Sequence, residues 1–358
     1  MSMDEPLLQV RAALQTSSNT VGVVASAHGG AEINKRIDSI MVDAVNRSVD
    51  LRPMVSRKPH DQLAYIWNVT TDFENSRVAF YSEGGTGTPQ PSKRTQLAAL
   101  AKSIRADYEV TNMHIAGSSS YYNALEDEAR NTVAALVIAE EKVFICGSDT
   151  VAYGLSGAYD GLIQLMDSNA AYGSTNTVYG VARAAARDEL DVQVVHAAPT
   201  TTAALTLAHL DSSITASDKR GAKGAKRIFF CSPERHDKIN QLLQAQQRFT
   251  GTLELEGGFS VSQYKRIPIV SSRFMDKNGV TWNGTVRTAS HVDNAMYLLD
   301  MDNVEFRVLD GVDATHVPIT GADASTRSDV QGGWFKTYGT FVMKRFDSQV
   351  IIDNLSTP

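Results

Sequence analysis

The stretch EEKVFICGSDTVAYGLSGAYDGLIQLM, residues 140–166, lies where the longest predicted helix ends and a second domain is expected to begin. We expect this helix to begin at Ser118–Ser120, whose hydroxyls can cap it, with Glu126–Glu128 placing negative charge near its positive end. Gly147 is predicted to end it in a left-handed conformation. About 26 residues at 1.5 Å each make a rod of roughly 40 Å. One face of it is apolar: Leu125, Ala129, Val133, Leu136, Val137 and Phe144.

Upstream of the helix, residues 60–115 are predicted to form one long two-stranded ribbon. QLAYIWNVTTDF (62–73) and NSRVAFYSE (75–83) are rich in aromatic and β-branched residues, and ADYEVTNMHI (106–115) alternates apolar and polar residues. An isolated ribbon of two strands is only marginally stable in water. We therefore expect it to lie against another molecule. The weakly periodic residues 1–50 read as an arm that neighbouring subunits hold in place.

A glycine- and proline-rich stretch, EGGTGTPQPSKR (83–94), interrupts the ribbon. A phosphate-binding loop would need a lysine directly after its last glycine and a helix that begins at that point, so that the helix N-terminus faces the phosphate. Here Pro89 and Pro91 intervene, and each proline removes a backbone donor. The stretch is therefore interpreted as a loop tip and not as a nucleotide site.

Downstream, residues 151–284 are expected to hold a second domain. Its clearest unit is RIFFCSPERHDKINQLL (227–243), a buried strand followed by a helix that Ser232 caps and Pro233 begins. TVYGVARAAARDEL (177–190) is predicted to be an amphipathic helix. AMYLLDMDNVEFRVL (295–309) is predicted to be a pair of strands about a short turn.

Composition narrows the class of protein. The 358-residue chain has a formal net charge of −6 and a pI near 5.8, which argues against a dedicated nucleic-acid binder with a broad basic face. No secretory signal and no membrane-length apolar run is visible. The two cysteines, Cys146 and Cys231, each end an apolar run and are expected to be small buried side chains, so neither a disulfide nor a zinc site is predicted.

The candidate residues for catalysis or metal binding do not converge on a recognisable site. His28 in SAHGGAE lacks the nucleophile motif that an esterase would need. Asp160, Asp300 and Asp302 are candidates for a cation site, but turn residues are the simpler interpretation. The basic segment 218–227 is interpreted as a solvated loop, with contact to nucleic acid or to an acidic neighbour as the alternative. We predict no catalytic residues, no cofactor site and no metal site.

The order of these parts resembles the major capsid proteins of tailed bacteriophages, whose fold is named after phage Hong Kong 97. The most specific part of the resemblance is residues 140–166, with RIFFCSPERHDKINQLL (227–243), YKRIPIVSS (264–272) and FKTYGTFVMKRFDSQVIIDNL (335–355) as later landmarks. The resemblance implies an α+β fold with an N-terminal arm, an extended loop, a peripheral domain built on a long spine helix, and an axial domain.

Mapped onto this chain, the resemblance implies four parts. They are an N-terminal arm (1–50), an extended loop in the form of a β-ribbon (51–115), a peripheral domain (116–150 and 285–358) and an axial domain (151–284). The loop tip would reach over a neighbouring subunit, with its glycines allowing turns and its cations available for charge pairs. The contact residues expected there are Gly84, Gly85, Gly87, Lys93 and Arg94.

The implied function is a structural, non-enzymatic subunit that assembles as hexamers and pentamers into an icosahedral shell around double-stranded DNA. Its expected partners are copies of itself, separate scaffolding and portal proteins, decoration proteins in some members, and packaged DNA held without sequence-specific contact. It would belong to the virion, would be assembled in the host cytoplasm and would contact no membrane. An encapsulin-like nanocompartment shell protein is the first alternative, and a cytosolic α/β hydrolase is a distant one.

Overall fold

The computed structural model of the chain divides into two units, residues 1–46 and 47–358. The first unit lies outside the described residues, and with it the expected arm apart from its last two residues, as well as His28. In the second unit the structure describes residues 49–72, 83–85, 92–118, 123–147, 157–166, 177–182, 190–197, 202–245, 252–255, 259–275, 295–319 and 329–356.

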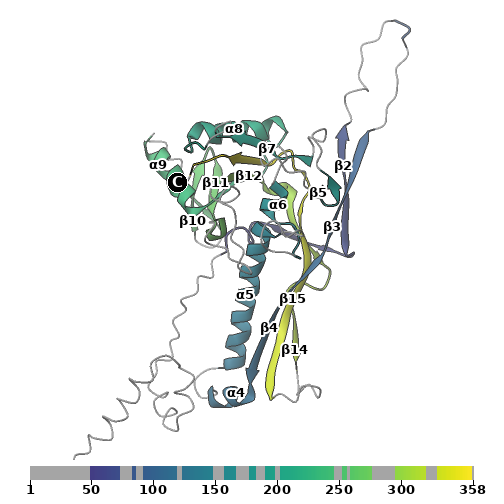
Figure 1. Cartoon of the computed structure of the whole chain (residues 1–358), viewed down its shortest axis with the longest axis vertical. Helices are drawn as coiled ribbons and strands as arrows, with labels where there is room; N and C mark the ends of the chain where they lie inside the picture. The colour runs from purple at the N-terminus through teal and green to yellow at the C-terminus, as the bar shows by residue number, and fades with distance from the viewer. Residues whose placement is uncertain are drawn as a thin grey trace, which may run out of the picture. The chain divides into compact units, whose positions relative to one another are not determined.

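The predicted long helix is present as α5, Ala124–Cys146 (Figure 1). Its cap differs from the prediction: the Asn123 side chain accepts a hydrogen bond from the Glu126 N–H. Ser118 instead ends a separate short helix, α4 (Asn112–Ser118). Gly147 does not take the left-handed conformation, because its φ is −58° and its ψ is 146°. Residues 143–147 at the end of α5 are buried, and the chain leaves the helix in an extended conformation.

A five-stranded sheet lies beside α5, which contacts β4 and β15. Its central strand is the long β15, Val330–Met343, and its residues 332–336 lie between two antiparallel partners, β4 and β14. Residues 339–343 of β15 pair with β13, which in turn pairs in parallel with β1. The other bounds are β1 Ser56–His60, β4 Lys102–Thr111, β13 Val304–Leu309 and β14 Thr315–Ile319.

The ribbon is shorter than predicted. It consists of β2 (Ala64–Asp72) and β3 (Lys93–Leu100), which form an antiparallel pair with a bulge between Thr70 and Asp72. The predicted third segment, ADYEVTNMHI, is not part of it: its strand residues belong to β4 in the five-stranded sheet, and its last four residues begin α4. The predicted strand NSRVAFYSE (75–83) falls almost wholly outside the described residues.

A seven-stranded sheet runs in the order β7-β16-β12-β8-β11-β10-β9, and Figure 1 shows it with the helices α8 and α9. The predicted strand-then-helix unit is confirmed as β8 (Arg227–Cys231) and α9 (Pro233–Ala245). Helix α8 spans Leu207–Lys219. The other strands are β7 Gln193–His196, β9 Thr252–Leu255, β10 Phe259–Tyr264, β11 Ile267–Ser271, β12 Met296–Asp300 and β16 Val350–Asp353.

Two local predictions are corrected. AMYLLDMDNVEFRVL does form two strands about a short helical turn (Met301–Asn303), but β12 and β13 belong to different sheets and do not pair. TVYGVARAAARDEL begins as a hairpin and not as a helix: β5 (Thr177–Val178) pairs with β6 (Val181–Ala182). The two residues between these strands both have positive φ, 50° and 81°, which suits a hairpin turn.

The sheets and helices enclose two hydrophobic clusters. The larger one gathers the end of α5, the short helix α6 (Leu162–Met166) and the five-stranded sheet around Phe144, Phe306 and Phe341. The smaller one lies between the seven-stranded sheet and the helices α8 and α9. Cys146 and Cys231 are both buried, as predicted, and burial raises the pKa of the Cys231 thiol to about 12. In the described part of the chain, no helix is long and apolar enough to cross a membrane.

Candidate functional site: an exposed ribbon and the charge network beneath it

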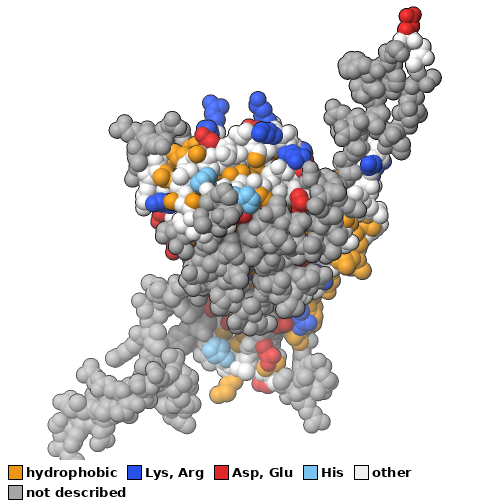
Figure 2. Space-filling model, turned by 45° about the horizontal axis from the view of Figure 1, so that its top comes forward, with side chains coloured by type: hydrophobic (Ala, Val, Ile, Leu, Met, Phe, Trp, Pro, Cys, Tyr) orange, Lys and Arg blue, Asp and Glu red, His pale blue; other side chains and the backbone are white. Residues whose placement is uncertain are grey.

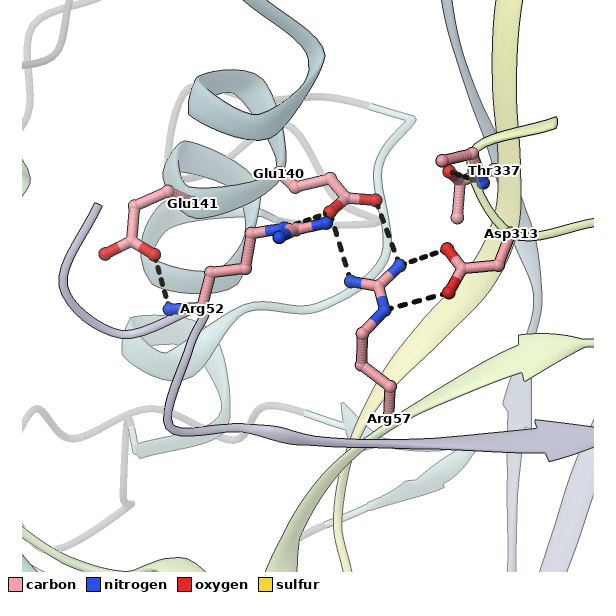
Figure 3. Close-up of polar contacts among 7 residues, drawn as sticks. Arg52, Arg57, Glu140, Glu141, Asp313 and Thr337 are labelled. Atoms are coloured by element: carbon pink, nitrogen blue, oxygen red, sulfur yellow. Dashed lines mark hydrogen bonds and ion pairs between the residues drawn. The ribbon is translucent and has the colours of Figure 1, made fainter. Parts of the chain in front are cut away.

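Glu141 on α5 binds the segment that follows the arm (Figure 3). Its fully buried carboxylate accepts hydrogen bonds from the backbone N–H groups of Asp50 (3.2 Å), Leu51 (2.8 Å) and Arg52 (2.6 Å). Burial raises the pKa of Glu141 above its usual value, although these three donors lower it in part. One side chain of α5 therefore fixes the backbone where the chain enters the five-stranded sheet.

The neighbouring Glu140 binds two arginines of the same entering segment. Its carboxylate accepts from Arg52 Nε at 2.6 Å and from Arg57 Nη1 at 3.1 Å. Arg57 also pairs with Asp313, in the turn between β13 and β14 (Figure 3). Although burial alone would lower the pKa of Arg57, the two carboxylates raise it. The charge network, Arg52, Arg57, Glu140, Glu141 and Asp313, thus joins α5, the segment that enters the sheet at β1, and the turn between β13 and β14.

A third buried carboxylate, Glu305 on β13, connects this region to the ribbon. It pairs with Arg307 at 2.7 Å, with Lys58 at 3.3 Å and with Lys344. These cations outweigh the effect of burial and lower the pKa of Glu305. The Arg307 guanidinium lies 4.4 Å from the ring centre of Tyr65 and donates to its hydroxyl at 3.2 Å. Tyr65 belongs to β2, so the base of the ribbon rests on this charged cluster.

The two faces of the ribbon differ at its base. On one face Leu97 and Ala99 are buried, and Tyr65 and Trp67 pack against the main core. On the other face Ile66 is exposed by 49% and Leu100 by 58%, and Leu63, which directly precedes β2, is exposed by 69%. Figure 2 shows hydrophobic side chains gathered below the ribbon. We call these three residues the apolar foot of the ribbon.

The predicted tip residues occupy two different places. Gly84 and Gly85 are exposed in a turn, where Gly84 has a φ of +83° that a side chain would strain. Lys93 and Arg94 are exposed but lie in β3, opposite Asp72 and Thr70, and not at the loop tip. Gly87 lies outside the described residues. Contact of these residues with a neighbouring subunit stays a prediction.

The aspartates considered for a cation site have structural partners. Asp300 accepts from the Asp302 N–H and from the Asn303 side chain, and so caps the turn after β12. The Asp302 carboxylate accepts from the Lys226 N–H. Asp160 lies in the connection before α6. Among the residues that the structure describes, no group of three or more metal-binding side chains is found.

The sequence interpretation missed Glu140, Glu141 and Glu305. A signal for the first two was present: both lie in the last two turns of α5, where negative charge opposes the helix dipole, and within the most apolar part of the helix. A carboxylate in such a place has to find a partner elsewhere in the fold. Nothing local identifies Arg52 or Arg57 as that partner, because 83 or more residues separate them from Glu140.

Comparison with known proteins confirms the expected fold. A family model described as SU10 major capsid protein matches residues 56–331. The capsid subunit of cyanophage A-1(L) superimposes with a TM-score of 0.63 at 15% identity, over 89% of this chain and 97% of that one.

Two further structures have the same fold. The SrpI encapsulin of Synechococcus elongatus gives a TM-score of 0.57 at 13% identity, covering 91% of this chain and 95% of that one. The capsid of an empty GTA particle gives 0.60 at 12% identity, covering 95% and 100%. No protein with a curated description matches the sequence.

Proposed function

Since the chain belongs to the SU10 major capsid protein family, we propose that it assembles as hexamers and pentamers into a closed icosahedral shell that encloses double-stranded DNA. The family match over residues 56–331 is the observation that carries this proposal. The fold shared with a cyanophage capsid subunit supports it. The role is structural: the chain would act through contacts repeated by symmetry, each modest on its own.

The ribbon is the part of the subunit that we assign to contact between copies. Its base is held by the main core and by Arg307, whereas its apolar foot is exposed in the single chain. Burial of exposed apolar area on a neighbour is favourable, at about 25 cal/mol per Å². The tip residues Gly84, Gly85 and Gly87, with Lys93 and Arg94 on β3, would extend the same contact.

The four-part division stays a proposal, and the sheets cross its boundaries in two places. β1 and β4, from the extended-loop range 51–115, pair with β13 and β15 of the peripheral range in the five-stranded sheet. The seven-stranded sheet combines β8 and β11, from the axial range 151–284, with β12 and β16, from the peripheral range 285–358. We therefore propose that the two domains share this sheet. Further proposed partners are a scaffolding protein, a portal protein and decoration proteins, and the proposed site of assembly is the host cytoplasm.

The second candidate function is a nanocompartment shell that holds a protein cargo. The observation behind it is the fold shared with the SrpI encapsulin over 91% of this chain. Both candidates predict closed shells, so only the contents distinguish them. A virus shell encloses nuclease-protected DNA when its packaging partners are present, whereas a nanocompartment encloses a protein.

The experiment is expression of the full chain, alone and with candidate scaffolding proteins, followed by sedimentation and negative-stain electron microscopy. We expect ring-shaped capsomers or closed shells. A chain that remains monomeric at high concentration with every candidate scaffold would contradict the proposal. Hydrolysis of simple ester substrates by such a monomer would support the distant hydrolase alternative instead.

A further inference from the structure

The last residue of α8 and the short turn that leads to β8, residues 219–226, present four cations that the proposed assembly does not use. Lys219, Lys223 and Lys226 are exposed, and Arg220 is half-exposed. Within the described part of the chain, no carboxylate lies at ion-pair distance from any of the three lysine side chains. In a chain whose net charge is −6, such a cluster is not a consequence of overall composition. We call residues 219–226 the basic turn.

Carboxylates next to the basic turn are already bound to other groups. Asp218 pairs with Arg227 at 2.6 Å. Asp347 pairs with Arg345 at 2.5 Å. Asp302 accepts the backbone N–H of Lys226 and leaves the side chain of that lysine outside ion-pair distance. The ammonium groups of the turn are therefore directed to solvent and not to the protein's own acids.

The backbone of the basic turn is fixed. Gly221 has a φ of +84°, its N–H donates to the Asp218 carbonyl, and the Ala222 N–H donates to the Ser217 carbonyl. This pattern is the Schellman motif that closes helix C-termini. Ala222 is buried, and the Arg345 guanidinium donates to the Arg220 carbonyl from the far end of the chain. The lysines thus extend from a rigid base, which lowers the entropy lost when they bind.

Two simpler roles for the cations do not account for the whole turn. Lys219 and Arg220 lie at the C-terminal end of α8, where positive charge stabilises the helix dipole, but this effect fades within the last turn and does not reach Lys223 or Lys226. A contact with an acidic protein would need an apolar centre, and lysine is depleted from such interfaces. The large exposed apolar side chains in the described residues are Leu63, Ile66, Leu100, Met113 and Ile319, none of them in this turn.

Binding of a phosphate backbone requires no apolar centre and no helix dipole. Such a backbone is bound by positive point charges such as lysine ammonium groups, which contact it without recognising sequence. Figure 2 shows Lys and Arg side chains near the top of the view, over the part of the molecule where Figure 1 places α8. We propose that the basic turn is the site at which this chain contacts the phosphates of double-stranded DNA. The inference rests on the proposed function, which gives the shell a DNA content.

The test measures binding of the unassembled full chain to a random duplex of about 30 base pairs, by fluorescence anisotropy at several salt concentrations. The variant is Lys219→Gln/Lys223→Gln/Lys226→Gln. Each phosphate contact contributes about 0.9 to the slope of log K against log salt, so we expect the slope to fall by up to about 3 and the affinity to fall about 10-fold or more near 0.1 M salt.

The matched control is Lys238→Gln/Lys265→Gln/Arg266→Gln, which removes the same charge from other elements next to the seven-stranded sheet. Loss of binding in the first variant and not in the control supports the proposal. Equal losses would show a response to net charge alone and overturn it, as would unchanged binding in the first variant. Polyglutamate that binds the turn as tightly as duplex DNA would assign it to an acidic protein instead. Shell formation by each variant is measured separately, so failure of assembly and failure of DNA contact are distinguishable.

Discussion

At the scale of single residues, Glu305 and Glu141 are both buried carboxylates whose surroundings shift their pKa values in opposite directions. The pKa of Glu305 is lowered from the usual 4.5 by Lys344, Arg307 and Lys58. The stability that Glu305 contributes is therefore complete above pH 4.5 and is lost as pH falls through the lowered value. The pKa of Glu141 is raised by burial. Its ionised form costs stability at neutral pH, and this cost disappears as pH falls through the raised value.

We therefore predict opposite changes in acid sensitivity for two matched variants. Glu305→Gln should be less stable than the wild type, with the largest difference at pH 7. This difference should shrink as pH falls below 4.5. For Glu141→Gln, the free energy of unfolding of the wild type should rise relative to that of the variant as pH falls towards 4.5. Urea unfolding midpoints between about pH 3 and pH 7 measure both effects. Parallel pH profiles for the wild type and the two variants would show that neither environment is as described.

At the scale of elements, the junction after α5 depends on two glycines in close contact. A Cβ on Gly147 would lie 2.3 Å from the Tyr159 carbonyl oxygen, and one on Gly161 would lie 2.5 Å from the Val143 carbonyl oxygen. The Gly161 N–H also donates to the Gly147 carbonyl at 2.8 Å. Because both obstacles are backbone atoms, no side-chain rotation relieves the clash.

Gly147→Ala and Gly161→Ala should each destabilise the fold by about 1–3 kcal/mol or more, as overpacked cores do. The control is Gly117→Ala in α4, where the added Cβ meets nothing within 4 Å. Since alanine is the better helix former, this control should keep or raise the stability, by up to about 1 kcal/mol. Chemical denaturation of the three variants compares them directly. A Gly147→Ala variant as stable as the control would refute the close packing described here.

Local signals in the sequence identified most of the elements, but not their partners. The apolar stripe of α5, and the strand, Ser232 and Pro233 before α9, are local features, and both helices were predicted. Pairing depends on distant segments, and so the prediction placed β4 in the ribbon and paired β12 with β13. The segment 177–190 was predicted to be a helix because its spacing is amphipathic, although the Tyr179–Gly180 turn favours a hairpin.

The candidate site was only partly visible in the sequence for the same reason. Gly84 in its turn and the strand character of β2 are local properties, whereas β3 was not predicted, and its first two residues, Lys93 and Arg94, were assigned to the loop tip. The pairing of Glu140 with Arg52 and Arg57 exists only after the first strand has docked beside α5. A buried acid near a helix C-terminus shows that some partner is needed, but it does not identify the partner.

At the scale of the whole molecule, the apolar foot of the ribbon should matter for assembly and not for folding. Ile66→Asp/Leu100→Asp places charge on a face that is solvent-exposed in the single chain. We expect unchanged unfolding of the dispersed chain and a loss of capsomers or shells, seen by sedimentation. Ser212→Asp/Gln241→Asp is the control, because both residues are exposed and lie outside the ribbon, on α8 and α9. Normal shells from the first variant would exclude the foot as a contact between copies.

The pairing of β4 with β15 also determines when the newly synthesised chain can complete its five-stranded sheet. Thr111 of β4 pairs with Val330 of β15, so more than two hundred residues must be synthesised before the two strands can meet. At about 5–20 residues per second, this delay is on the order of 10–40 s. The parallel partner of β1, β13, also lies beyond residue 300. Until then a chain on the ribosome has no finished sheet against which its ribbon can pack. Neighbouring chains made from the same mRNA therefore cannot assemble before each is nearly complete.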